Sequence, residues 1–368
     1  MRAPPTRRFL LTRRQALLGA GALMLNKPAV AATCWVEAPP EDVGLGRDLG
    51  NVIDAALAGV NFDHKLRAII VARHGRLVFE HYFPEPVSGF VQHPRTTRPI
   101  ASVTKSVTGL LYGIALARGF VPTPDAPLMD QFPEYADLAS EEKKELLVEH
   151  ALTMTLGLRW NEELPYGRAD NDANVMFLAQ DPYRFVLSKP IVDPPGTKFA
   201  YNGGATELLG RLIAKGTGRS LEDFARANFF APLDIDSGNW ALGANGQPMA
   251  SSGIRISARD LARIGQLVFD NGIWNGRAVV PETWLRETFR QRVAISRFLS
   301  YGYQWRIDQR FWPGKRCLFA SGNGSQRIFV FPVHGLVIAT MGNAFNLETQ
   351  GVAPRAVVTA VLASLRET

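Results

Sequence analysis

The feature that most constrains this chain is a serine and a lysine three residues apart, Ser102 and Lys105, within a mostly apolar segment. If a helix begins near Ser102, positions i and i+3 share one face, so the hydroxyl and the ammonium group can meet. A serine hydroxyl is a poor nucleophile until a base removes its proton, and a lysine can be that base if burial lowers its pKa. The apolar residues between Ile100 and Ile114 predict that burial. A residue at a helix start also has a backbone N–H that can bind an oxyanion.

The spacing alone is weak evidence, because Ser140 and Lys143 repeat it at the start of a strongly charged segment. There the serine is predicted to cap a solvated helix. A helix cap is also the alternative interpretation of Ser102. The catalytic interpretation therefore depends on further motifs that agree with it.

The first 31 residues predict a secretory signal rather than a part of the fold. Arg13 and Arg14 precede an apolar run that reaches Leu25, and residues 29–31 offer a small-residue cleavage site. This pattern is typical of the twin-arginine type, although Arg7 and Arg8 form a second pair upstream. The apolar run is too short for a stable membrane span. We expect cleavage after Ala31, export to the periplasm and no stable span in the mature chain.

The same segment explains the basic character of the chain. It holds six basic residues and no acidic one, so its removal takes the net charge from +7 to near +1. The charge therefore gives no indication of nucleic-acid binding. The six histidines show no metal-ligand spacing, and we expect no metal and no other cofactor. Whether Cys34 and Cys317 form a disulfide stays open, because sequence does not show that they are close.

Strand patterns stand at both ends of the chain and helical patterns lie between them. Strands are predicted as a hairpin over 66–83 that turns at His74 and Gly75, and later at 301–307, 316–320, 326–331 and 336–341. Helices are predicted at 102–119, 205–215, 257–269 and 352–366.

This order predicts an α/β chain of the α+β kind, with one antiparallel sheet built from both chain ends and flanked by helices. We expect a sheet domain over 32–121 and 256–368 and an inserted, mainly helical domain over 122–255. A ligand site between these two parts is then the natural expectation.

Two further motifs belong with the serine and lysine. Tyr201 lies in a glycine-flanked loop just before a predicted helix, where a phenol could relay protons between nucleophile and leaving group. The stretch 319–326, which holds Gly322 and Asn323, lies between strands and lacks bulky side chains near its centre. A strand edge of this kind can supply a second oxyanion N–H. Taken singly, the tyrosine could be a packing residue and the glycines could be turn residues.

Together, Ser102-x-x-Lys105, Tyr201-Asn202 and Ala320-Ser321-Gly322, which Asn323 follows, resemble the motifs of the serine β-lactamase and penicillin-recognising hydrolase superfamily. Within it, the chain most resembles class C β-lactamase-like esterases and 6-aminohexanoate-dimer hydrolases, over residues 45–365. Supporting stretches are 152–158, 199–204, 252–262, 272–276 and 301–305.

The resemblance implies that Ser102 is the acylated nucleophile and that Lys105 and Tyr201 share the base and acid work. It also implies an oxyanion hole made by the backbone N–H groups of Ser102 and Asn323, next to Gly322. Whether neutral Lys105 or a Tyr201 phenolate is the general base stays open.

The chain departs from that pattern in two places. The superfamily has Tyr-x-Asn, but here Asn202 follows the tyrosine directly and Gly203 stands at the asparagine position. Asn202 is therefore only a candidate for that role. The third motif there begins with Lys or His, which attracts a substrate carboxylate, but here it begins with Ala320. Arg327 on the next strand could supply a charge, although strand alternation can turn it away.

These departures favour an uncharged ester or a small amide as substrate. The leading hypothesis is an exported serine hydrolase that cleaves such a molecule through a covalent acyl-enzyme. A β-lactamase or DD-peptidase is the first alternative, and a non-catalytic penicillin-binding-like protein is the second. Trp160, Tyr166 and Trp305 could contact substrate, but packing is the commoner role of such residues. The physiological substrate and the oligomeric state stay open.

Overall fold

An antiparallel sheet organises the fold, with the strand order β2-β1-β12-β11-β10-β9-β8-β7. The computed structural model describes residues 35–60, 63, 65–86, 88–163, 165–236, 239–311 and 315–366. The predicted signal segment and Cys34 lie outside these residues. The strands of the sheet are β1 (Leu66–Arg73), β2 (Arg76–Tyr82), β7 (Val293–Ser296), β8 (Leu299–Tyr301), β9 (Arg306–Asp308), β10 (Cys317–Gly322), β11 (Gln326–Phe331) and β12 (Leu336–Gly342).

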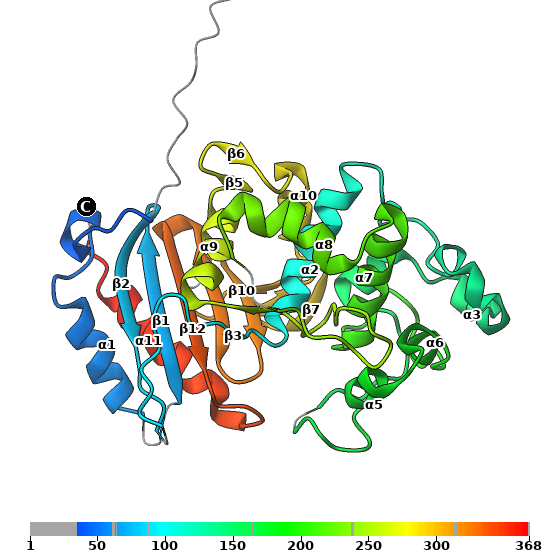
Figure 1. Cartoon of the computed structure of the whole chain (residues 1–368), viewed down its shortest axis with the longest axis horizontal. Helices are drawn as coiled ribbons and strands as arrows, with labels where there is room; N and C mark the ends of the chain where they lie inside the picture. Colours follow the sequence, from blue (N-terminus) through cyan, green and yellow to red (C-terminus); the bar gives the residue numbers. More distant parts are fainter. Residues whose placement is uncertain are drawn as a thin grey trace, which may run out of the picture. The chain divides into compact units, whose positions relative to one another are not determined.

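The sheet joins the two ends of the described chain. β1 pairs with β12, with Val71 opposite Ile338, so a strand near the start of the fold lies beside one near its end. Figure 1 shows this arrangement, with the blue strands β1 and β2 next to the orange-red β12. The sequence prediction of one antiparallel sheet from both ends is confirmed.

Helices cover both faces of the sheet. α1 (Leu49–Ala58) and α11 (Val352–Ala363) pack on one face, where Ile53 and Val357 join Phe329 in a buried apolar cluster. α2 (Val103–Leu116) and α9 (Ala258–Phe269) pack on the other face, where Val107 and Leu261 are fully buried. This second cluster continues into the helical part of the chain, so α2 lies between the sheet and the other helices.

The remaining elements lie mostly between β2 and β7 in the chain. The helices are α3 (Glu141–Lys144), α4 (Val148–Thr153), α5 (Asp172–Leu178), α6 (Pro182–Leu187), α7 (Gly203–Thr217), α8 (Leu221–Ala225) and α10 (Glu282–Thr288). Two short ladders pair β3 (Arg98–Pro99) with β4 (Arg255–Ile256) and β5 (Ile273–Trp274) with β6 (Arg277–Ala278). Single 3₁₀ or π turns lie at Pro40–Val43, Met129–Gln131, Pro133–Leu138, Arg226–Phe230, Ala231–Leu233, Pro332–His334 and Glu348–Gly351.

One strand prediction is wrong. The sequence predicted a single strand over 301–307, but β8 ends at Tyr301 and β9 begins at Arg306, and the two pair as a hairpin. The chain turns because Gln304 has a φ of 60° and its buried side chain bonds to Ala151 O, at 2.9 Å, and to Thr206. Tertiary hydrogen bonds thus override the strand propensity of this aromatic segment.

The other helix and hairpin predictions agree with the structure to within a few residues. The hairpin turns at His74 and Gly75, as predicted. Cys317 is a buried free thiol in the described part of the chain, and a pairing with Cys34 lies outside the described residues. No helix within the described ranges has the length and apolar character needed to cross a bilayer. The proposed division into a sheet domain and a helical domain stays a prediction.

Candidate active site

Ser102 stands immediately before α2, and its side chain makes no capping hydrogen bond. Lys105 Nζ instead donates to Ser102 Oγ at 3.1 Å. Ser140, which has the same spacing from a lysine, does cap its helix and accepts from the Lys143 N–H at 3.3 Å. Ala101 has a φ of 47°, an uncommon value for a residue with a side chain, directly before the serine. The two serines therefore have different roles, and Ser102 lies next to a buried ammonium group.

Lys105 is 3% exposed and is held by several groups. Its ammonium donates to Ser251 O at 3.1 Å, lies 3.5 Å from Glu162 Oε1, and lies 4.9 Å from the centre of the Tyr201 ring. Burial acts to lower the pKa of Lys105, but the charges of Tyr201 and Glu162 outweigh it, and the pKa is raised above its usual value. The sequence-based expectation of a lowered pKa is therefore not supported by the electrostatics.

Glu162 is the residue that the sequence analysis missed. Its side chain is 2% exposed, and besides Lys105 it accepts from Trp160 Nε1 at 2.9 Å and Tyr166 OH at 3.1 Å. It also accepts from the Gly203 N–H. A Cβ at Gly203 would lie 2.9 Å from Glu162 Oε2, too close for an asparagine to stand there unless the glutamate moved. Glu162 thus occupies the space that the asparagine of a Tyr-x-Asn motif would need.

A second buried carboxylate supports the lysine indirectly. Glu207 of α7 accepts from the Ala250 N–H at 3.0 Å, the Ser251 N–H at 2.9 Å and Ser251 Oγ at 2.7 Å. These bonds fix the segment whose Ser251 carbonyl accepts from Lys105. Burial raises the pKa of Glu207.

Tyr201 and Asn202 lie side by side in sequence but face different environments. The Tyr201 ring contacts Lys105 and also Arg306, whose Cζ lies 5.2 Å from the ring centre. Asn202 is 2% exposed and caps α7, because its Oδ1 accepts from the Ala205 N–H at 3.1 Å. Among the hydrogen bonds of the described residues, none joins Asn202 to Lys105. The structure therefore brings Tyr201, but not Asn202, to the lysine.

The end of β10 lies against Ser102. A Cβ at Gly322 would lie 3.1 Å from the Ser102 nitrogen and 2.3 Å from Ile100 O, so only glycine fits there without displacement. Within the described chain, no turn or loop hydrogen bond uses the N–H of Ser102 or Asn323. Both donors are therefore available to a carbonyl oxygen.

A polar bridge links the end of β10 to the loop that carries Glu162. Asn323 Nδ2 donates to Asn346 Oδ1 at 2.9 Å, and the Tyr166 N–H donates to the same oxygen at 3.2 Å. Burial, followed by the negative charge of Glu162, raises the pKa of Tyr166. Tyr166 is thus held between Asn346 and Glu162, next to the serine and lysine.

Other residues considered from the sequence have packing roles. Trp305 is fully buried, and its Nε1 donates to Ser106 O at 3.2 Å. Arg327 is 6% exposed and donates to the carbonyls of Gly322 and Gln326. Ala320 is buried in the core. None of these three side chains presents a free charge at the serine.

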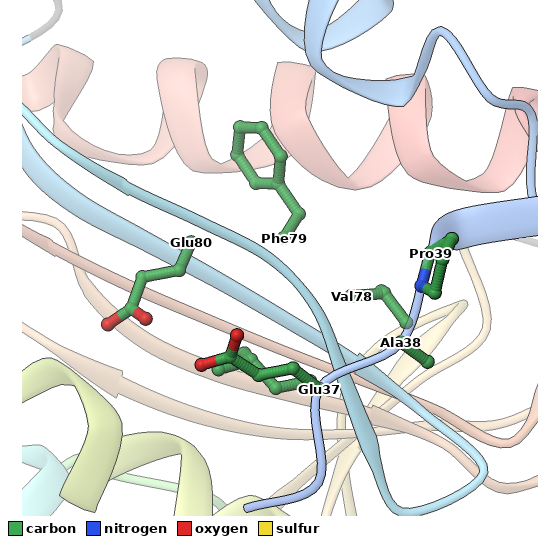
Figure 2. Close-up of a pocket in the computed structure, with 7 residues that line it drawn as sticks. Glu37, Ala38, Pro39, Val78, Phe79 and Glu80 are labelled. Atoms are coloured by element: carbon green, nitrogen blue, oxygen red, sulfur yellow. The ribbon is translucent and has the colours of Figure 1, made fainter.

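A hollow of about 520 Å³ lies elsewhere on the molecule. It is lined by residues 37–39 and 77–80, between the first described segment and β2, and Figure 2 shows Glu37 and Glu80 among its lining residues. None of the candidate site residues lines it. In the described ranges, no group of His, Cys, Asp and Glu side chains is arranged to hold a metal ion.

The fold and this constellation define the class of serine β-lactamase-like proteins. The family model described as Beta-lactamase matches residues 61–362, so the chain belongs to the β-lactamase family. The chain is similar to the 6-aminohexanoate-dimer hydrolase of Paenarthrobacter ureafaciens, at 23% identity over 283 residues that cover 73% of this chain and 67% of that protein.

Solved structures share the fold at lower identity. EstCE1, a hydrolase with promiscuous acyltransferase activity, matches with a TM-score of 0.71 and 14% identity, covering 86% of this chain and 98% of that one. A penicillin-binding protein homologue from Caulobacter crescentus matches with a TM-score of 0.69 and 17% identity, covering 88% and 99%. These two structures show that the chain shares the fold of known hydrolase-like and penicillin-binding-like proteins.

Proposed function

We propose that this chain is an exported serine hydrolase that cleaves an ester or a small amide through an acyl-enzyme on Ser102. The observation that carries the proposal is the 3.1 Å contact between Ser102 Oγ and Lys105 Nζ, at a helix start where the serine makes no cap. The similarity to a 6-aminohexanoate-dimer hydrolase and to EstCE1 supports the reaction class.

The electrostatics favour one of the two candidate bases. Because its pKa is raised, Lys105 carries a proton at neutral pH and donates hydrogen bonds. We therefore assign removal of the Ser102 proton to Tyr201, whose ring centre lies 4.9 Å from the Lys105 ammonium group.

The reaction then follows from these positions. Ser102 Oγ bonds to the substrate carbonyl carbon, and its proton passes to Tyr201. The N–H groups of Ser102 and Asn323 stabilise the negative oxygen of the tetrahedral intermediate. Tyr201 returns the proton to the leaving alcohol or amine as the carbonyl–heteroatom bond breaks. Water, deprotonated in the same way, then cleaves the ester on Ser102 and restores the free serine.

Covalent labelling tests the assignment. A fluorophosphonate probe should label the purified protein stoichiometrically, and Ser102→Ala should lose at least about 99% of that label, because only an activated serine reacts at an appreciable rate. Ser140→Ala is the matched control, since it removes the serine of the same spacing that caps a helix. Intact labelling of the Ser102→Ala protein would refute the proposal.

A β-lactamase or DD-peptidase is the second candidate, favoured by the family match and by the penicillin-binding protein homologue of the same fold. Turnover of nitrocefin against 4-nitrophenyl esters separates the two candidates. Faster nitrocefin turnover would favour the second one. An acyl-enzyme seen by mass spectrometry without turnover of any substrate would indicate a non-catalytic binding protein instead.

A further inference from the structure

We propose that Arg306 binds a carboxylate of the substrate beside the reaction centre. The inference rests on the proposed hydrolase function and adds a substrate class to it. It revises the sequence-based expectation of an uncharged substrate, which depended on the absence of a charge at Ala320.

Arg306 lies at the site because of the turn that the sequence did not predict. The hairpin between β8 and β9 makes Arg306 the first residue of β9, opposite Tyr301 on one side and Phe319 of β10 on the other. Its guanidinium carbon lies 5.2 Å from the centre of the Tyr201 ring and 5.8 Å from that of Tyr301. The Tyr201 ring thus contacts both Arg306 and Lys105, which itself bonds to Ser102.

Among the described residues, no carboxylate pairs with the guanidinium of Arg306. In the part of the chain that the structure describes, it makes no hydrogen bond and no ion pair, and the residue is only partly buried. Nearby arginines differ, since Arg310 pairs with Asp308 and Arg292 with Glu149 at 2.8 Å. A planar fork of N–H donors without an acceptor, next to reacting groups, is suited to a carboxylate.

The local charge also favours an anion. Burial lowers the pKa of Arg327 to about 9, and the positive charge of Arg306 nearby is the second cause of that shift. Among the described residues, Arg327 donates only to backbone carbonyls, so no carboxylate neutralises its positive charge. A carboxylate at Arg306 would relieve the repulsion between the two guanidinium groups.

The position along β10 indicates how far the carboxylate lies from the scissile bond. Phe319, opposite Arg306, precedes Gly322 by three residues, which is roughly 10 Å along a strand. The arginine side chain covers part of that separation. A carboxylate a few bonds from the scissile carbonyl can therefore reach Arg306 while the carbonyl oxygen lies near the Ser102 N–H.

Matched ester pairs test the inference. Phenyl acetate against 3-carboxyphenyl acetate places the carboxylate on the leaving group, and 4-nitrophenyl butyrate against mono-4-nitrophenyl glutarate places it on the acyl group. We expect the anionic member of at least one pair to have a kcat/KM roughly tenfold to a hundredfold higher, the usual worth of a charge-assisted hydrogen bond. Arg306→Gln should abolish that ratio, and Arg306→Lys should keep part of it.

The readout is the ratio of kcat/KM for the anionic ester to that for the neutral ester. The absolute rate is not used, because Arg306 also contacts Tyr201, and its substitution can change the rate for both esters. Arg286→Gln is the matched control, since it removes one positive charge from an exposed pair on α10, and it should leave the ratio unchanged. An absent preference for the anionic esters would overturn the inference. So would an equal loss on both members of a pair in Arg306→Gln, since Arg306 would then act through Tyr201.

A binding measurement separates this inference from the proposed reaction. Calorimetry with Ser102→Ala should detect 3-acetamidobenzoate, a stable anionic analogue, at least tenfold tighter than acetanilide, and adding Arg306→Gln should remove the difference. If labelling and ester turnover fail while this difference persists, the carboxylate site stands without the hydrolase. If neutral esters turn over but neither assay shows an anion preference, the hydrolase stands and the carboxylate site does not.

Discussion

Glu162 gives the buried lysine an anionic neighbour where the superfamily motif has a neutral asparagine. A carboxylate favours the protonated ammonium group, whereas an amide does not hold a charge. In the proposed reaction, this difference bears on which residue accepts the proton of Ser102. It also explains how the site tolerates Gly203, because the missing side chain leaves room for the glutamate.

We predict that Glu162→Gln lowers the kcat/KM for a neutral ester roughly 10- to 100-fold, in the range of lost catalytic hydrogen-bond partners. Removing the anion disfavours the protonated amine, so the pKa of Lys105 should fall. The loss of activity at alkaline pH should then begin at a lower pH than in the parent enzyme. The pH dependence of kcat/KM between pH 6 and 10.5 measures this shift.

Glu163→Gln supplies the control for this experiment. Glu163 is exposed, and its substitution removes the same charge from the same loop. It should leave both the rate and the alkaline limit unchanged. An unchanged pH profile in Glu162→Gln would show that the glutamate does not set the protonation of Lys105.

Local spacing explains which site residues were predictable. Ser102 and Lys105 share one turn of helix, so their proximity follows from the sequence alone. The motif resemblance marked Tyr201, and the structure brings its ring to the lysine. Glu162 was not predictable in the same way, because its contact with Lys105 spans 57 positions and depends on the path of a loop. Gly203 was the available signal, since a glycine in place of asparagine leaves a buried amine in need of another acceptor.

Helix α2, which begins directly after Ser102, packs closely against its neighbours through two glycines. Gly109 lies against Gln304, and Gly113 lies against Trp284 of α10, where a Cβ would meet the ring at 2.0 Å. Trp284 Nε1 donates to Gly109 O at 2.9 Å across this contact. The absence of side chains therefore lets α10 and the β8–β9 turn approach the helix closely.

Gly113→Ala should lower the free energy of unfolding by about 1–3 kcal/mol, because the added methyl group forces Trp284 out of its position. The midpoint of urea unfolding, followed by circular dichroism, measures the loss. Gly59→Ala is the control: its φ is −71° and its nearest neighbour would lie at 3.5 Å, so stability should stay equal or rise slightly. Equal behaviour of the two variants would contradict the close packing described here.

The wrong strand prediction at 301–307 shows where periodicity stops being informative. Tyr301, Tyr303 and Trp305 alternate as in a strand, and all three are buried. Nothing local indicates that Gln304 bonds to α4 and α7 and thereby turns the chain. Residues 336–341 were predicted correctly because both faces of β12 meet apolar helices, which leaves a continuous apolar run.

The two ends of the fold are joined by polar contacts as well as by the sheet. Glu85 accepts from Arg98 of β3 at 2.7 Å, from Arg67 of β1 at 3.1 Å and from Asn343, just after β12, at 3.0 Å. β3 is followed closely by Ser102, so this cluster connects the segment before Ser102 to both end strands. Sequence patterns did not reveal this cluster, because its members are polar or charged residues that lie far apart in the chain.

Glu85→Gln should therefore destabilise the fold in a pH-dependent way. Partial burial acts to raise the pKa of Glu85, but Arg98 and Arg67 outweigh it and hold that pKa below its ordinary value. A carboxyl group with a lowered pKa contributes stability at pH values above its unfolded pKa, near 4.5. It loses that contribution as the pH falls through its folded pKa.

We expect Glu85→Gln to lower the free energy of unfolding by about 1–3 kcal/mol at pH 7, between the values for exposed and buried ion pairs. The loss should shrink as the pH falls below the unfolded value, because the parent protein then progressively loses the contribution of its charged carboxyl, and urea unfolding at pH 7 and pH 3.5 measures both. Glu282→Gln, from an exposed pair on α10, should change stability by less than about 0.5 kcal/mol at either pH. A loss at pH 3.5 as large as that at pH 7 would mean that Glu85 acts by packing rather than by its charge.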